Sequence, residues 1–204
     1  MKNRLLALLL TLVMLLSMVV VPASADESEN ALSFSAISFT TDNKGNLIEG
    51  DKLDKIEAGQ VFALKVSLQN LSNTQFTVGA CTLIIRYNEK ALKGYTFSYR
   101  GRECGPVMAG DFSMVEGTLN GSILKFAAID SGILLAPKGE EYSSVTIGYV
   151  MFEANEAVET GNLEFTVVEG DNFVVSDTKE NMPSVSFDDI NLSIPVKGNP
   201  PVLD

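Results

Sequence analysis

The stretch FALKVSLQ, residues 62–69, alternates apolar side chains with small or polar ones. A period of two is the pattern of a β-strand with one face in a core and the other in water. Turn-forming clusters separate the stretches with this pattern, and none shows a sustained helical period, so helix is expected only as a short turn near residues 89–92. The other alternating stretches are residues 33–40, 78–87, 122–130, 145–153, 163–168 and 185–194, with shorter ones at 94–99 and 111–115. Eight or nine strands over this length predict an all-β protein, a β-sandwich.

Residues 1–25 have the three parts of a secretory signal peptide. Lys2 and Arg4 precede an apolar run at residues 5–21, and a small-residue cleavage site ends at Ala25. The run is slightly short for a membrane span, so an uncleaved anchor is the less favoured alternative. We therefore expect a secreted, extracellular protein without membrane insertion after cleavage, made of one domain at residues 26–196 and a mobile tail at residues 197–204.

The charge balance excludes several classes of partner. The chain has 15 basic and 26 acidic residues, and loss of Lys2 and Arg4 leaves 13 against 26, a formal net charge of −13. Nucleic acid and anionic lipid both need positive charge on the protein, so neither is an expected partner.

Catalytic chemistry also finds little support. The chain contains no His, which removes His-based triads and most catalytic zinc sites. The paired carboxylates are Asp188 with Asp189 and Glu140 with Glu141, and neighbours on a regular strand point to opposite faces. We expect no enzyme activity and no cofactor.

Two local patterns could support metal or covalent chemistry. Residues 42–46, DNKGN, superficially resemble a calcium loop, but aligning Gly45 with the invariant glycine puts Thr40 at the first carboxylate position. A hairpin turn is therefore the favoured interpretation, and no metal site is expected. Cys81 and Cys104 would close a disulfide loop worth about 3 kcal/mol in an oxidising compartment, or remain as two free thiols. Both alternatives stay open.

The alternation assigns faces to two strands. In residues 78–87 the set with Cys81 and Leu83 faces one way and the set with Thr82 and Ile84 the other. In residues 122–130 the inward set is Leu124, Phe126 and Ala128, which turns Ile123, Lys125, Ala127 and Ile129 outward. If this register holds, Ile84, Ile123, Ala127 and Ile129 form an exposed apolar patch, as binding surfaces often do. A reversed register or a covering loop would remove the patch.

The order of several short motifs resembles the cohesin domain of cellulosome scaffoldins. The motifs are AGQ at residues 58–60, GACTLIIRYN at 79–88, AL at 91–92, GSILKFAAIDSG at 121–132, and the strand at 145–154. Each motif is weak alone, and the match in order and spacing runs from about residue 56 to residue 196.

The resemblance implies a nine-stranded, jelly-roll-like β-sandwich without catalytic activity. It implies binding of a dockerin, a small calcium-binding helical module carried by an enzyme or another scaffold, in the service of extracellular polysaccharide degradation. The contact would use the sheet face that contains residues 78–87 and 122–130, where the alternation also places the apolar patch. The expected partner-binding residues are Thr82, Ile84, Ile123, Ala127, Ile129, Asp130 and Ser131.

Departures from the cohesin pattern affect the expected specificity. Ala80 and Thr82 stand where many type I cohesins have an Asn and an Asp that hydrogen-bond the dockerin, and Asn88 and Glu89 replace the usual Asp-Pro. Asp130 and Ser131 match the family and are expected at the rim of the contact, so any dockerin bound here would differ in specificity from those of type I.

Two other functions remain as alternatives. One is a carbohydrate-binding module of the same fold, with a polysaccharide as ligand. Such sites stack sugars on planar aromatic rings, yet the chain has no Trp. The rings that could serve are Tyr87, Tyr95, Tyr99, Tyr142 and Tyr149. The other alternative is a structural surface protein. The Asn-x-Ser sequons at Asn70, Asn120 and Asn191 indicate a surface loop or strand end.

Overall fold

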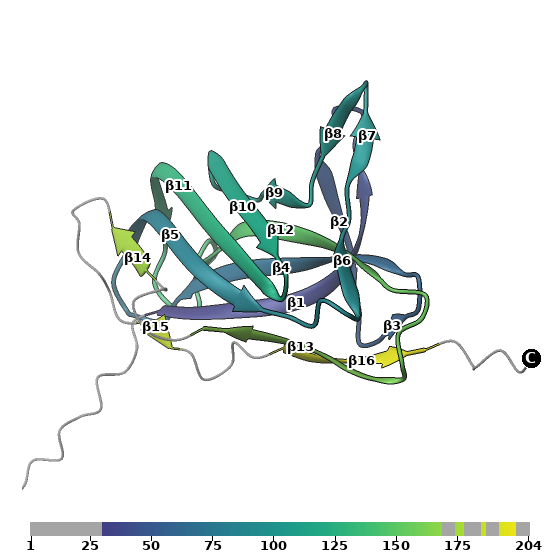
Figure 1. Ribbon diagram of the computed structural model, residues 1–204. Coiled ribbons are helices and arrows are strands. Elements are labelled where there is room, and N and C mark those ends of the chain that lie inside the picture. Colours follow the sequence, from purple (N-terminus) through teal and green to yellow (C-terminus); the bar gives the residue numbers. More distant parts are fainter. Residues whose placement is uncertain (1–29, 169–173, 178–184, 187–191, 199–204) are drawn as a thin grey trace, which may run out of the picture.

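The computed structural model describes residues 30–168, 174–177, 185–186 and 192–198, and the account below concerns these residues. They form sixteen strands and no helix (Figure 1). The prediction of an all-β sandwich is confirmed. The strands outnumber the nine expected because many are segments of only two to four residues. Within these residues no helix long and apolar enough to cross a membrane is present.

The first sheet contains seven strands. Its central members β1, β4 and β12 are antiparallel neighbours. In spatial order the path is β15 (Val185–Ser186), β1 (Asn30–Thr41), β4 (Val61–Asn70), β12 (Ser144–Ala154) and β6 (Leu92–Gly94), with β2 (Leu47–Lys52) paired to β1 and β9 (Val107–Ala109) to β12.

The second sheet also contains seven strands, and a separate two-stranded ribbon projects beside β2 in Figure 1. In spatial order the sheet runs β10 (Met114–Asn120), β11 (Ile123–Leu135), β5 (Phe76–Arg86), β13 (Gly161–Val167), β16 (Leu192–Lys197) and β3 (Ile56–Glu57), with β14 (Val174–Asp177) alongside β5. The ribbon consists of β7 (Phe97–Tyr99) and β8 (Arg102–Cys104).

The main core lies between the two sheets and is built from the inward half of each alternating strand. In β4, Phe62, Leu64, Val66 and Leu68 are all fully buried. In β5 and β11 the buried residues are Cys81, Leu83, Ile85, Leu124, Phe126 and Ala128, so the predicted inward sets are confirmed. Phe62, Phe152 and Phe165 join the sheets at the centre, with ring centroids 5.5 to 6.4 Å apart.

Three predicted strands differ from the structure. Residues 185–194 were expected as one strand, but β15 pairs with β1 in the first sheet whereas β16 pairs with β13 in the second. Residues 94–99 divide between β6 and β7, and of residues 111–115 only the last two belong to a strand, β10, which continues to Asn120. Alternation of apolar and polar residues indicates which way each side chain points. It does not show where the backbone passes from one sheet to the other. Residues 89–92 hold the expected turn, closed by a bond from the Leu92 N–H to the Asn88 carbonyl.

The outer face of β4 was expected in water and is partly covered instead. Ala63 is fully buried in a second apolar cluster, with Ile37, Tyr149 and Met151, on the outer side of the first sheet. Half-buried apolar side chains pack over this second cluster; they are Phe39, Leu47, Tyr95, Phe97 and Met108. The covering residues come from the β1–β2 hairpin and from the segment that runs from β6 through β9. Alternation within β4 cannot show how these other segments pack.

Residues 42–46 form the predicted hairpin turn between β1 and β2. The Asp42 carboxylate accepts bonds from the backbone N–H groups of Lys44 and Asn46 at 2.7 and 2.9 Å. Bonds from Asn46 above all hold the pKa of Asp42 below its usual value. Gly45 has φ of 85° and lies against the Tyr99 ring, so a side chain there would be strained and would collide with the ring. In the described part of the chain, no cluster of three potential metal-ligating side chains is found.

The two cysteines are both free thiols, which decides between the alternatives left open by the sequence. Cys81 is buried on β5, and Cys104 is half-buried on β8 of the ribbon. Asn70, the first sequon residue, is also fully buried, and its side chain bonds to Ser72, Thr74 and Ala136. Asn70 is therefore a structural residue at the end of β4, and its side chain is not accessible for glycosylation. Asn191 lies outside the described residues.

Candidate partner-binding face

The outer side of β10, β11 and β5 forms a regular grid, here called the partner face. β11 lies between β10 and β5 and is antiparallel to both, so each of its outward residues has a neighbour on either side. Side chains directly opposite one another have Cβ atoms about 5 Å apart. The four rows are Met114, Ile129 and Ala80; Glu116, Ala127 and Thr82; Thr118, Lys125 and Ile84; and Asn120, Ile123 and Arg86.

One end of the partner face is apolar and exposed. Met114 and Ile129 lie opposite each other and are 60% and 56% exposed. Leu134, farther along β11, is 55% exposed. Large apolar side chains that remain this exposed side by side mark a surface suited to a protein partner.

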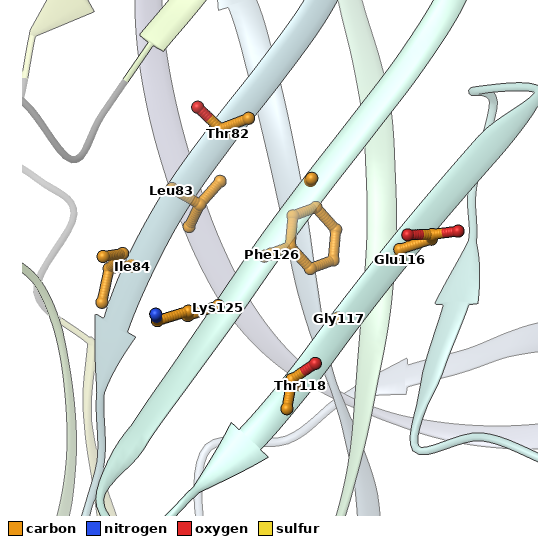
Figure 2. Close-up of a pocket in the computed structure, with 9 residues that line it drawn as sticks. Thr82, Leu83, Ile84, Glu116, Gly117, Thr118, Lys125 and Phe126 are labelled. Atoms are coloured by element: carbon orange, nitrogen blue, oxygen red, sulfur yellow. The ribbon is translucent and has the colours of Figure 1, made fainter.

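The middle of the partner face is hollowed. A hollow of about 380 Å³ lies over Ala127, because the second row combines this small residue with Thr82. Figure 2 shows Glu116, Thr118 and Lys125 placed around it and Ile84 beyond Lys125. A protruding side chain of a partner would fit into this central hollow, where surrounding contacts exclude water.

Charged residues occupy the other half of the partner face. Glu116, Lys125 and Arg86 are exposed, and none of them makes an ion pair with another described residue. Exposed charges beside an apolar area are the usual composition of an interface rim.

Lys125 also changes the shape of the expected apolar patch. On β11 it stands between Ile123 and Ala127, so the four predicted patch residues divide into two areas. Ile129 and Ala127 lie in one area, while Ile84 and Ile123 lie diagonally across the strands in the other. All four side chains lie on the outer side, as the predicted register requires, and Lys125 stands among them.

At the rim, Asp130 is engaged by its own chain. Its carboxylate accepts bonds from the Ser113 hydroxyl, from the Ser113 N–H at 3.0 Å and from the Gly132 N–H at 2.9 Å. The Ser113 hydroxyl is the main reason that the pKa of Asp130 lies below its usual value. These bonds stabilise an irregularity in β11 between Ile129 and Ile133, while the neighbouring Ser131 remains exposed.

The structure brings all seven predicted site residues to this face or its rim. Thr82, Ile129 and Ser131 are exposed, whereas Ile84, Ile123, Ala127 and Asp130 are half-buried. Their role in binding stays a prediction. Met114 was missed, since residues 111–115 were expected as a short separate strand and not as the start of a strand paired with β11. The outward position of Met114 follows from its pairing with Ile129 on β11, which no pattern within residues 111–115 indicates.

No tyrosine lies in the rows of the partner face. Tyr87 and Tyr149 are buried, Tyr95 and Tyr99 belong to the segment with the ribbon, and Tyr142 lies between β11 and β12. A sugar-stacking platform, the alternative considered from the sequence, is not what these four rows provide.

Several solved structures that share this fold are cohesins. A type I cohesin from Pseudobacteroides cellulosolvens has a TM-score of 0.52 at 16% identity, over 86% of this chain and 96% of that one. A type II cohesin from Bacteroides cellulosolvens has a TM-score of 0.52 at 13% identity, over 82% and 99%. A type II cohesin–X–dockerin complex from Acetivibrio cellulolyticus has a TM-score of 0.51 at 13% identity, over 84% and 100%.

Sequence comparison adds no relative: no family model matches the chain, and no curated protein matches it. At these identities the structural similarity defines the fold alone. The protein is a cohesin-like β-sandwich, and the resemblance noted in its sequence agrees with this fold.

Proposed function

We propose that this protein is a non-catalytic, secreted binding module whose partner face holds a dockerin-type, calcium-binding helical module. The observation that carries the proposal is the exposed Met114–Ile129 pair beside the central hollow over Ala127. In this role the protein brings a dockerin-bearing partner, such as an enzyme, to a site of extracellular polysaccharide degradation.

The partner face suits a convex, helical ligand. Helices present apolar side chains at spacings of three and four residues, and one such ridge could cover the Met114–Ile129 pair while a single side chain enters the central hollow. Glu116, Lys125 and Arg86 would then meet polar groups at the edge of the ligand. Binding energy concentrated in the apolar end of the partner face would make Ile129 a hot spot.

Specificity would differ from that of type I cohesins at the first and second rows, which contain Ala80 and Thr82. Thr82 offers a neutral hydroxyl and Ala80 a methyl group where those cohesins have an Asp and an Asn. A hydrogen bond to a charged group is worth about 1.5–3 kcal/mol, so loss of such an acceptor disfavours ligands that depend on it. The preferred dockerin should therefore present apolar side chains to this part of the face.

Catalysis is not part of the proposal. Glu140 and Glu141 are exposed in the segment between β11 and β12, and Asp188 and Asp189 lie outside the described residues. The proposed work of the protein is recruitment, which needs a surface and no reacting group.

The test is binding of purified dockerin modules from the same organism to the full protein, expressed with its own leader and immobilised. We expect at least one dockerin to bind in calcium and to be lost in EDTA. Ile129→Asp should weaken binding at least about 100-fold, since about 2.8 kcal/mol of hot-spot energy corresponds to that factor.

Ile48→Asp is the matched control. Ile48 lies on β2 of the first sheet and is 48% exposed, so it introduces the same charge at similar exposure away from the partner face. It should leave dockerin binding unchanged. Binding by no dockerin, or equal loss with both variants, would contradict the proposal.

A further inference from the structure

The second apolar cluster on the first sheet is not fully covered. Phe39, Val61, Tyr95 and Phe97 line a hollow of about 300 Å³ together with Thr40 and Thr41, here called the aromatic hollow. All four apolar side chains are half-buried. Val61 and Phe39 stand on the outer side of the sheet, next to the buried Ala63 and Ile37, so this site lies on the opposite side of the sandwich from the partner face.

The aromatic rings of the hollow are inclined to one another and leave a shallow concavity between them. Phe39 and Tyr95 meet edge to face, with centroids 6.5 Å apart and planes inclined by 60°. Phe97, the first residue of β7, adds a third ring to the lining. Three aromatic side chains thus remain partly accessible in one concavity, although the adjoining Ile37 and Met151 are almost completely buried.

The lining selects a chemical class of ligand. No charged residue lines the aromatic hollow, so an ionic ligand would find no counter-charge there. The lining is not purely apolar, because the hydroxyl-bearing residues Thr40 and Thr41 at the end of β1 also line it. Apolar ring faces beside neutral polar groups match a pyranose, which has an apolar C–H face and a rim of hydroxyls.

Size and position narrow the ligand further. A volume of about 300 Å³ is at the lower end for small-ligand pockets, which suits one or two sugar rings and is too small for a helix. We propose that the aromatic hollow binds a unit of a neutral polysaccharide, independently of any protein held on the partner face. The two sites on opposite sheets would let the module hold a partner and a polysaccharide at once.

The test is electrophoresis of the full protein in native gels that contain hydroxyethyl cellulose, xylan or galactomannan, with polygalacturonate as the charged counterpart. We expect at least one neutral polysaccharide to retard the protein and polygalacturonate not to. The double variant Tyr95→Leu/Phe97→Leu keeps apolar side chains but removes two planar faces, and should reduce retardation at least about tenfold, or about 1.4 kcal/mol.

Tyr142→Leu is the matched control, because Tyr142 is 74% exposed between β11 and β12 and lines no part of the aromatic hollow. It should leave retardation unchanged, as should Ile129→Asp, which separates this site from the partner face. No retardation by any of the three neutral polysaccharides would overturn the proposal. So would equal retardation of the double variant and the wild type.

A fluorescence measurement covers the case in which the double variant fails to fold. The chain has no Trp, so Phe97→Trp places a single reporter in the aromatic hollow. Titration with cellohexaose, xylohexaose or mannohexaose should change its emission in a saturable way with at least one sugar. An emission that stays constant with all three sugars would overturn the proposal.

Discussion

On the first sheet, the outward-facing Ala63 of β4 and Met151 of β12 are fully buried, whereas on the second sheet the outward-facing Met114 of β10 and Ile129 of β11 are 60% and 56% exposed. Both sheets consist of alternating strands and share one core. The difference comes from the chain around them: among the described residues, a hairpin and the segment that carries the ribbon cover the outer side of the first sheet.

This contrast separates two uses of apolar surface. Side chains such as Met151 that are removed from water by their own chain contribute to folding stability, at roughly 25 cal/mol per Å² of buried apolar area. Side chains such as Met114 that are left exposed contribute little to stability and are available to a partner. The same residue type in the two places should therefore respond very differently to mutation.

The largest expected effect comes from the two methionines. Met151→Ala should lower the free energy of unfolding by about 2–5 kcal/mol, because Met151 is fully buried and its loss leaves a cavity. Met114→Ala should change it by less than about 0.5 kcal/mol, as is usual for an exposed position. Urea titration of the two variants measures both values. Similar losses in stability would mean that the two outer faces do not differ as described.

The sequence predicts the burial of a side chain well where alternation within one strand determines it, and poorly where distant segments determine it. The inward positions of Leu83 and Phe126 follow from alternation within one strand and were predicted. The covering of Ala63 depends on residues such as Tyr95 and Met108, which belong to other parts of the chain and show no periodic pattern. The position of Met114 depends on its register with Ile129, which no pattern within residues 111–115 contains.

The division of the predicted patch has a similar origin. Lys125 was predicted to face outward, but its effect on the patch becomes visible only when the rows across three strands are known. The split of residues 185–194 between two sheets is also a matter of which strands become neighbours. Local pattern thus predicted the fold class and the outward-facing side of β5 and β11, while pairing between distant segments decided the surface in detail.

A smaller effect is expected where the cover of the first sheet includes a polar contact. The Tyr149 hydroxyl donates a bond of 2.6 Å to the Glu49 carboxylate, which Lys65 also contacts at 2.7 Å. Partial burial alone would raise the pKa of Glu49, but the bonds from Lys65 and Tyr149 and the charge of Lys65 hold it below its usual value. Tyr149→Phe should lower the free energy of unfolding by about 1 kcal/mol, a modest value because Glu49 is partly exposed.

The acid dependence of this contact has a definite sign. A carboxyl group with a depressed pKa in the folded protein stabilises above its unfolded pKa, here 4.5, and loses that contribution as the pH falls through the folded value. The difference in stability between the wild type and Tyr149→Phe should therefore shrink below about pH 4.5, as measured by urea titration at several pH values. A difference that grows on acidification would contradict the assignment.

The smallest effect on stability should come from chemical labelling of the two thiols, which lie in the two regions compared. Cys81 points from β5 into the core beneath the partner face, and complete burial raises its pKa to about 12. Cys104 lies on the ribbon that stands over the first sheet, and it is half-buried. Thiolates are the reactive species. A thiol reagent at neutral pH should therefore label Cys104 in the folded protein and Cys81 only in urea.

The cysteine that is labelled first shows which of the two regions opens more readily in the folded protein. Labelling at Cys104 with little change in the free energy of unfolding, within about 0.5 kcal/mol, is expected for a position at the surface of the cover. Labelling at Cys81 without denaturant would mean that β5 opens readily. The partner face would then lack the rigid sheet on which the positions of Thr82 and Ile84 depend, and its exposed apolar rows would reflect weak packing instead of a prepared binding surface.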